Sequence, residues 1–319
     1  MSVALVTGAL GQDGRYLTRL LQDRGARVVG AVRDPARGGA PGIDLGRWDT
    51  TSIAAIADML ARVRPTLVFN LAAFSSGAGM WDDPVAIGET NGLAVARLLE
   101  AVRHVDPTIR VAQAGSSEMF GRAEVSPQSE ATPFRPRSPY GAAKVFAHHM
   151  IEHYRERHGL FACSAILYNH ESPLRRPEFV TRKITLAAAR IALGIQRGVT
   201  VGNLAARRDW GYAGDTARAL LAMLEADAPD DYVIATGVTH SVEDLCRTAF
   251  AHVGLDWRVH VREDVGAARA PERVALVGDA TRARARLGWT PEVDFAQLIA
   301  MMVDADREAA RLEPTEDPA

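Results

Sequence analysis

Tyr140 and Lys144 have the types and the spacing needed for proton transfer. They are four residues apart in SPYGAAK, at the start of a helix-like stretch, and side chains at that spacing lie on one helix face. A cationic lysine beside a phenol favours phenolate, so we expect a lowered Tyr140 pKa and proton exchange with a substrate hydroxyl. An isolated Tyr–Lys pair is more often an ordinary surface pair, so further residues must support this interpretation.

The segment AGSSEMFG adds hydroxyl and carboxyl groups after a strand-like run. It places Ser116, Ser117 and Glu118 at the carboxyl end of that run, the edge of a parallel sheet where ligands bind. Hydride transfer alone needs Ser, Tyr and Lys. Glu118 adds a group that can remove a carbon-bound proton and return one to a leaving hydroxyl, which favours an elimination. Taken alone, Glu118 could equally be a helix-start carboxylate.

A glycine-rich turn near the N-terminus predicts a dinucleotide site. TGALGQDG follows the strand-like residues 3–7 and opens a helix-like run over 12–23. Glycines allow close backbone approach, and a helix N-terminus offers N–H groups and a positive dipole to a pyrophosphate. A tight turn without a ligand is the alternative. The residues assigned to the site are Gly8, Gly11, Gln12, Asp13 and Gly14.

The residue after the second predicted strand favours NADP over NAD. NAD enzymes usually carry an acidic residue there and NADP enzymes a basic one. Arg33 occupies this position with Arg37 nearby, although the adjacent Asp34 keeps NAD as the alternative. Two later segments fall where adenine and ribose would lie, with ordinary strand-end packing as the alternative. They add Asp44, Leu45, Leu71, Ala72 and Ala73 to the predicted cofactor site.

Short apolar segments alternate with longer amphipathic ones in the first half of the chain. Strands are predicted at 3–7, 27–32, 66–70, 109–114 and 161–167. Helical patterns between them imply right-handed crossovers and an α/β, Rossmann-like doubly wound parallel sheet.

The regular alternation of strand-like and helix-like segments changes after about Asn169. Helices are predicted at 180–193 and 215–225, with strands near 201 and at 232–235. We therefore assign residues 1–168 to a dinucleotide-binding domain that carries the catalytic residues. Residues 169–319 are expected to form mainly a smaller C-terminal substrate-binding lobe, with some segments returning to the first domain.

Composition argues against several other classes of protein. The net charge of the 319 residues is −2, which gives no field to attract nucleic acid or a membrane surface. Only Cys163 and Cys246 occur, without metal-ligand spacing, so neither disulfides nor a metal are expected. There is no basic leader and no apolar run of about 20 residues, so we expect a cytoplasmic protein.

Six longer strings carry a more specific resemblance. They are SSEMFG at 116–121, PFRPRSPYGAAK at 133–144, NHESP at 169–173, FVTRKIT at 179–185, RDWGYAGD at 208–215 and VIATGVTHSV at 233–242. On these strings the chain resembles the GDP-mannose 4,6-dehydratase family of extended short-chain dehydrogenases/reductases. The resemblance covers most of the chain and implies an NADP-dependent lyase of deoxysugar-nucleotide biosynthesis.

This resemblance also implies roles for individual residues. Ser116, Glu118, Tyr140 and Lys144 match the family's catalytic positions, and Tyr140 and Lys144 would also contact the cofactor. In the implied reaction Tyr140 takes the proton of the sugar hydroxyl at carbon 4 while hydride passes to NADP. Glu118 then removes the carbon 5 proton, water leaves from carbon 6, and the hydride returns there. The GDP-mannose site would comprise Ser117, Asn169, Lys183, Arg208, Arg269 and Glu272.

The chain departs from the family pattern in three places. Loop 74–81 has Ser76 where histidine is usual, the arginine-rich loop after the second strand is shortened to residues 33–42, and an insertion before RAPERVALVGD is missing. Relatives use the longer loop to join dimers into tetramers and to cover NADP. We therefore expect a homodimer, formed through the helix of Tyr140, with a more open cofactor site.

Three other functions stay open at this point. The chain could be a 4,6-dehydratase of another nucleotide sugar. It could be a 4-keto reductase or an epimerase, neither of which needs Glu118. It could also be a non-catalytic NADP-sensing module, although such modules usually lose the Tyr–Lys pair.

Overall fold

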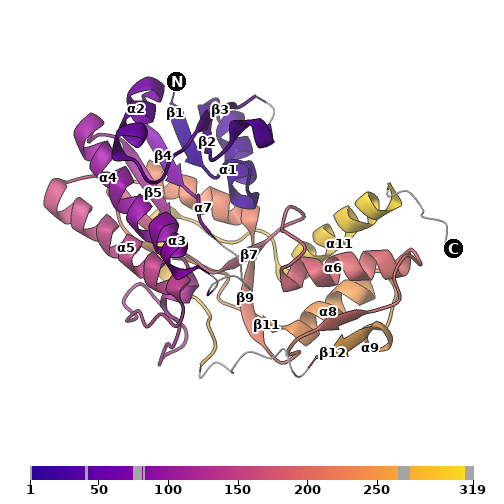
Figure 1. Ribbon diagram of the computed structural model, residues 1–319. Coiled ribbons are helices and arrows are strands. Elements are labelled where there is room, and N and C mark those ends of the chain that lie inside the picture. Colours follow the sequence, from indigo (N-terminus) through magenta and orange to yellow (C-terminus); the bar gives the residue numbers. More distant parts are fainter. Residues whose placement is uncertain (1, 40–41, 75–80, 82, 265–273, 313–319) are drawn as a thin grey trace.

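A seven-stranded parallel sheet is the frame of the larger half of the molecule (Figure 1). The computed structural model describes residues 2–39, 42–74, 81, 83–264 and 274–312. The strand order is β10-β6-β5-β4-β1-β2-β3, and the middle strands read as apolar runs because both faces of the sheet are covered. The strands are β1 (Val3–Thr7), β2 (Arg27–Val32), β3 (Asp44–Arg47), β4 (Leu67–Asn70), β5 (Arg110–Ala114), β6 (Ala162–Leu167) and β10 (Tyr232–Ile234).

Helices cover both faces of this sheet. One layer contains α1 (Gln12–Asp23), α7 (Ala213–Glu225) and α10 (Thr281–Leu287). The other contains α2 (Ile53–Val63), α4 (Ala94–Val105) and α5 (Pro139–His158). Short helices α3 (Pro84–Gly88) and η2 (Glu89–Leu93) pack on α5, while η1 (Pro35–Arg37) and η3 (Ser117–Met119) follow β2 and β5. The doubly wound α/β class predicted from the sequence is confirmed.

The smaller half has its own apolar core between α6 (Val180–Ala192), α8 (Val242–His252) and α11 (Phe295–Arg311). Its edge is the two-stranded sheet of β8 (Val199–Val201) and β12 (Val261–Glu263), preceded by α9 (Trp257–His260). A three-stranded sheet, ordered β11 (Thr239–Ser241), β9 (Arg207–Tyr212) and β7 (Asn169–Glu171), lies where the two halves meet (Figure 1). No helix in the described ranges is both long and apolar enough to span a membrane.

Besides α10, two more elements that follow Asn169 belong with the large sheet. β10 pairs in parallel with β6, with Val233 opposite Ile166, and both residues are fully buried. α7 packs on α1 and on strands β5 and β6. The five strands predicted for the first half are present with ends that differ by at most one residue, whereas β3 was not predicted as a strand.

Candidate active site

Two adjoining cavities lie at the carboxyl ends of the large sheet's strands. The larger measures about 1260 Å³ and is lined by the β1–α1 turn and the ends of β2, β3 and β4. The smaller measures about 430 Å³ and is lined by the end of β5, the start of α5 and the strand β7. Asp13, Leu71, Ala73, Arg175 and Phe179 line both, so a ligand in one would meet a ligand in the other.

The turn between β1 and α1 fits a dinucleotide pyrophosphate. Gly8 has φ +68°, and a Cβ there would lie 3.1 Å from the amide nitrogen of Ala72. A Cβ on Gly14 would lie 2.4 Å from the Gly8 oxygen, so α1 approaches the turn too closely for any other residue. Gly11 is the N-cap of α1 and provides no side-chain oxygen to its first N–H groups, which suits an anionic ligand.

Most of the predicted cofactor residues line the larger cavity. They are Gly8, Gly11, Gln12, Asp13, Gly14, Arg33, Leu71, Ala72 and Ala73. Arg33 is exposed directly after β2. Asp34, the acidic alternative, also lines the cavity, and its carboxylate caps η1 by accepting from Ala36 N at 3.1 Å. The side chain of Arg37 is outside the described residues.

Asp44 and Leu45 are not where the sequence analysis put them. Asp44 opens β3 opposite Val29, and its carboxylate lies 3.4 Å from Arg27. The side chain of Leu45 packs over Gly30, where a Cβ would lie 2.7 Å away. Only the end of β3 reaches the carboxyl edge. The cavity is therefore lined by Arg47, the last residue of β3, and by the residues that follow, Trp48, Asp49, Thr50 and Thr51.

The predicted catalytic residues meet in the smaller cavity. Ser116, Glu118, Tyr140 and Lys144 all line it, together with Ser117, a predicted substrate residue. Ser116 is the N-cap of η3 and accepts from Glu118 N at 3.2 Å, which fixes the turn after β5.

The start of α5 is fixed against this turn. Ser138 caps α5 by accepting from Gly141 N at 3.1 Å. A Cβ on Gly141 would lie only 2.5 Å from the Glu118 carbonyl oxygen, so the helix bearing Tyr140 touches the backbone of η3. This close approach brings the phenol and the carboxylate into one cavity.

The electrostatics of Tyr140 differ from the expectation of a lowered pKa. Burial raises the pKa of Tyr140 to about 12; a hydrogen bond with Ser116 opposes this rise and the Glu118 carboxylate reinforces it. Lys144 Nζ lies 5.7 Å from the centroid of the Tyr140 ring and donates to Ala114 O at 2.7 Å. Burial lowers the pKa of Lys144 to about 8, although the Asp13 carboxylate opposes this.

Glu118 has a cationic neighbour, Arg137. Arg137 Nε lies 3.9 Å from Glu118 Oε2, and the two side chains are 24% and 18% exposed. At this distance the guanidinium holds the carboxylate loosely, so the carboxylate can still face a ligand.

The predicted substrate residues are only partly brought together. Asn169 begins β7, Arg208 lies in β9, and both line the smaller cavity with Ser117. Lys183 is exposed on α6 and lines neither cavity. Arg269, Glu272 and the loop residue Ser76 lie outside the described residues.

His170 was not singled out in the sequence and lines the smaller cavity. Its Nε2 lies 3.0 Å from Asp13 Oδ2, and its backbone oxygen accepts from Gln12 Nε2 at 3.0 Å. Burial lowers the pKa of His170, but the charge of Asp13 and the hydrogen bonds to Asp13 and to the Tyr168 carbonyl together raise it above its ordinary value. Ser172 adds a hydrogen bond to Gln12 Oε1 at 2.8 Å, so the phosphate turn is tied to the chain that follows β7.

Arg175 was also missed. Its Nε lies 3.0 Å from Glu171 Oε2, and its guanidinium stacks on the Phe179 ring at 3.5 Å. The four-residue spacing between Glu171 and Arg175 is the one sequence signal for this pair.

Comparisons with known proteins agree with this geometry. The sequence model of the family described as GDP-mannose 4,6 dehydratase matches residues 5–302. The chain is 44% identical over 330 residues to GDP-mannose 4,6 dehydratase 1 of Arabidopsis thaliana, covering 98% of this chain and 91% of the relative. It is 38% identical over 347 residues to the Homo sapiens GDP-mannose 4,6 dehydratase, covering 98% and 93%.

A solved structure agrees as well. UDP-glucose 4-epimerase of Thermus thermophilus, in complex with NAD, superimposes with a TM-score of 0.82 at 26% identity, covering 96% of this chain and 99% of that chain. The epimerase shares the fold, while the family match and the two relatives share the sequence over almost the whole chain. This protein therefore belongs to the GDP-mannose 4,6-dehydratase family.

Proposed function

We propose that this protein converts GDP-mannose to GDP-4-dehydro-6-deoxymannose by internal hydride transfer and loss of water, with NADP in the larger cavity. The observation that carries the proposal is the shared cavity of Glu118 with Ser116, Tyr140 and Lys144, which adjoins the dinucleotide cavity. Family membership supports the substrate, and the epimerase solved with NAD supports a nicotinamide dinucleotide.

In the proposed reaction a nicotinamide bound in the larger cavity would supply the hydride acceptor for carbon 4 and the hydride donor for carbon 6. Tyr140, as phenolate, accepts the proton of the hydroxyl at carbon 4, and Ser116 hydrogen-bonds the same oxygen. The carbon 4 ketone acidifies carbon 5. Glu118 removes the carbon 5 proton and returns it to the departing hydroxyl at carbon 6. The hydride is then delivered to carbon 6, and the proton held by Tyr140 goes to carbon 5, which restores the phenolate. Lys144 and the positive charge of an oxidised nicotinamide favour the phenolate that this chemistry needs.

We propose that Asn169 and Arg208 contact the GDP part of the substrate, because a diphosphate is matched by amide donors and guanidinium groups. Both line the smaller cavity beside the catalytic residues. Ser117 is proposed to contact the sugar. Contacts of Lys183, Arg269 and Glu272 with GDP stay predictions of the family resemblance, as does the cytoplasmic location.

A panel of nucleotide sugars tests the proposed function. Each sugar is incubated with the protein and catalytic NADP, and products are read by mass spectrometry and NMR. We expect loss of one water from GDP-mannose. Dehydration of a different nucleotide sugar, isomerisation without loss of water, or binding of NADP with no turnover at all would each contradict the proposal and select one of the other functions.

Arg33→Ala is expected to weaken NADP binding by about tenfold or more while changing NAD binding little. Arg33 lines the cavity at the end of β2, where a guanidinium can bind the 2′-phosphate that only NADP carries. Titration of the purified protein with both dinucleotides measures this. Arg19→Ala, which removes an exposed guanidinium from α1 away from the cavity lining, is the control. Equal losses for NADP and NAD would assign specificity to Asp34.

We also propose a homodimer formed through α5. Phe146 on this helix is 41% exposed, and a Cβ on Gly92 of η2 would lie 3.3 Å from its ring. Val85 and Leu93, on α3 and η2, are 76% and 42% exposed, so apolar side chains gather over packed elements. Light scattering after size exclusion should give a dimer across dilution, and Phe146→Glu should give a monomer. A stable tetramer would contradict the argument from the short loop after β2.

A further inference from the structure

The face of α5 that carries Tyr140 continues as a buried polar face behind the active site. Lys144 and His148 are only 2% and 4% exposed. Three side chains of α5 form hydrogen bonds with residues of β5 or β6. The contacts are Lys144 Nζ to Ala114 O at 2.7 Å, His148 Nδ1 to Ser164 Oγ at 2.9 Å and Arg155 Nη1 to Ala162 O at 2.9 Å. The helix is therefore held against the sheet along about 16 Å of its length.

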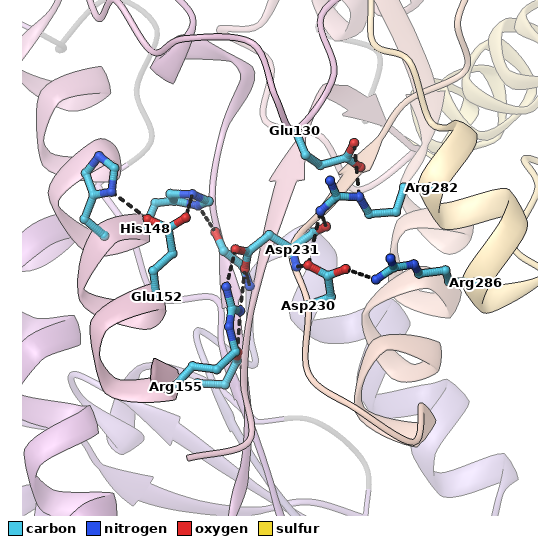
Figure 2. Close-up of polar contacts among 11 residues, drawn as sticks. Glu130, His148, Glu152, Arg155, Asp230, Asp231, Arg282 and Arg286 are labelled. Carbon is cyan, nitrogen blue, oxygen red and sulfur yellow. Dashed lines mark hydrogen bonds and ion pairs between the residues drawn. The ribbon is translucent and has the colours of Figure 1, made fainter. Parts of the chain in front are cut away.

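Asp231 lies at the centre of this arrangement (Figure 2). It is 5% exposed and directly precedes β10. Its two oxygens accept from Arg155 Nη1 at 3.0 Å and from Nη2 at 2.7 Å, and Oδ1 also accepts from Ser164 N at 2.8 Å. One carboxylate thus joins α5, β6 and the start of β10.

A second group of polar residues, Arg282, Asp230 and Glu130, holds the segment of Asp231 in place. Arg282 of α10 lies 3.1 Å from Asp230 and also donates to the Asp231 carbonyl oxygen at 3.2 Å. Glu130 accepts from Val233 N at 2.8 Å and lies 3.6 Å from Arg282 (Figure 2). The segment carrying Asp231 is therefore fixed from two sides.

The same cluster contains side chains that could bind a metal, since atoms of His148, Glu152 and Asp231 lie within 4.8 Å of one another. Both carboxylate oxygens of Asp231 already accept from the Arg155 guanidinium, which would repel a cation. Bidentate Arg–carboxylate pairs fix geometry as well as charge. The contacts therefore favour a role in orienting α5.

We propose that Asp231 is a positioning residue for Tyr140 and Lys144, which acts through Arg155 and the rigid helix α5. Removing its charge leaves the partly buried Arg155 guanidinium, whose side chain is 19% exposed, without its anionic partner, and we expect the C-terminal part of α5 to shift so that water can reach the guanidinium. A displacement of about 1 Å at reacting groups costs on the order of 100-fold in rate. The rate effect rests on the proposed function, whereas the effect on the helix does not.

The test compares Asp231→Asn with Asp215→Asn. Asp215 is the matched control because it is 4% exposed, pairs with Arg218 at 2.8 Å and accepts from Glu292 N at 2.9 Å, but belongs to α7. We expect Asp231→Asn to lower kcat about 10- to 100-fold at a temperature well below its Tm, with KM for the sugar nearly unchanged. Asp215→Asn should lower Tm and leave kcat intact.

Hydrogen exchange gives a readout that does not need turnover. In Asp231→Asn, amides at the start of α5, residues 141–145, should exchange faster although Arg155 lies several turns away, and in Asp215→Asn they should not. The proposal is overturned if Asp231→Asn lowers Tm but leaves both kcat and this exchange unchanged. If the variant does not fold, Arg155→Lys, which keeps the charge but loses the bidentate contact, decides by the same two measurements. A wild type inactive on every sugar refutes the proposed function, while the exchange result still decides this proposal.

Discussion

Glu118→Gln is expected to lower the rate of dehydration by about 100- to 10,000-fold, the usual contribution of a general base. The amide keeps the shape of the side chain but cannot accept the carbon 5 proton. Oxidation at carbon 4 should continue, because Tyr140 and Ser116 are unchanged. The 4-keto sugar and reduced nicotinamide should therefore accumulate in a single turnover, and carbon 5 should no longer exchange its proton with deuterated water.

Mass spectrometry of the sugar follows dehydration, and absorbance of the nicotinamide follows oxidation at carbon 4, so the two steps are measured separately. Glu124→Gln is a suitable control, since Glu124 is exposed and pairs with Arg135 in the loop after η3. Dehydration by Glu118→Gln at the wild-type rate would show that another group is the base. Loss of oxidation and dehydration together would show that Glu118 acts earlier than proposed.

Tyr140→Phe is expected to stop both halves of the reaction, again by at least about 100-fold. Phe removes the group that accepts the carbon 4 proton, so neither ketone nor reduced nicotinamide should form. Tyr16→Phe on α1, outside the lining of both cavities, is the control. Substantial oxidation by Tyr140→Phe would transfer the base role to another residue of the cavity.

The raised pKa of Tyr140 makes the rate of carbon 4 oxidation depend on pH, and Glu118 affects that dependence. Burial and the Glu118 carboxylate both raise this pKa, so the phenolate is scarce at neutral pH and oxidation should speed up as pH rises. Glu118→Gln removes one cause of the rise. The pH dependence of carbon 4 oxidation should therefore move to lower pH in Glu118→Gln, and an unmoved profile would show that the two groups do not interact.

The sequence alone was sufficient to predict the parts of the site that depend on residues close together in the chain. Gly8, Gly11 and Gly14 follow a strand and open a helix, and the close contacts at Gly8 and Gly14 show why no other residue fits. Tyr140 and Lys144 share a face because helix geometry is local. Ser116 and Glu118 follow a strand end, and parallel strands bring their ends to one edge of a sheet.

Features that depend on register and burial could not be predicted in this way. A shift of a few residues in β3 decides whether Asp44 or Asp49 reaches the cavity, and the short loop before β3 carries no signal for it. The raised pKa of Tyr140 follows from burial between segments far apart in sequence. The pair of Asp13 with His170 joins the phosphate turn to β7 across most of the first half of the chain.

The return of the chain to the large sheet has a consequence for synthesis on the ribosome. Among the residues that the structure describes, β10 completes the outer edge of β6, and Asp231 supplies the carboxylate that pairs with Arg155. Until that segment has emerged, a nascent chain that holds all the catalytic side chains still presents an open strand edge and the Arg155 guanidinium without its counter-ion, both of which favour misassembly. The contacts that complete the catalytic half join residues far apart in the sequence, and such contacts slow folding. The catalytic half can reach its final form only after much of the smaller half has been translated.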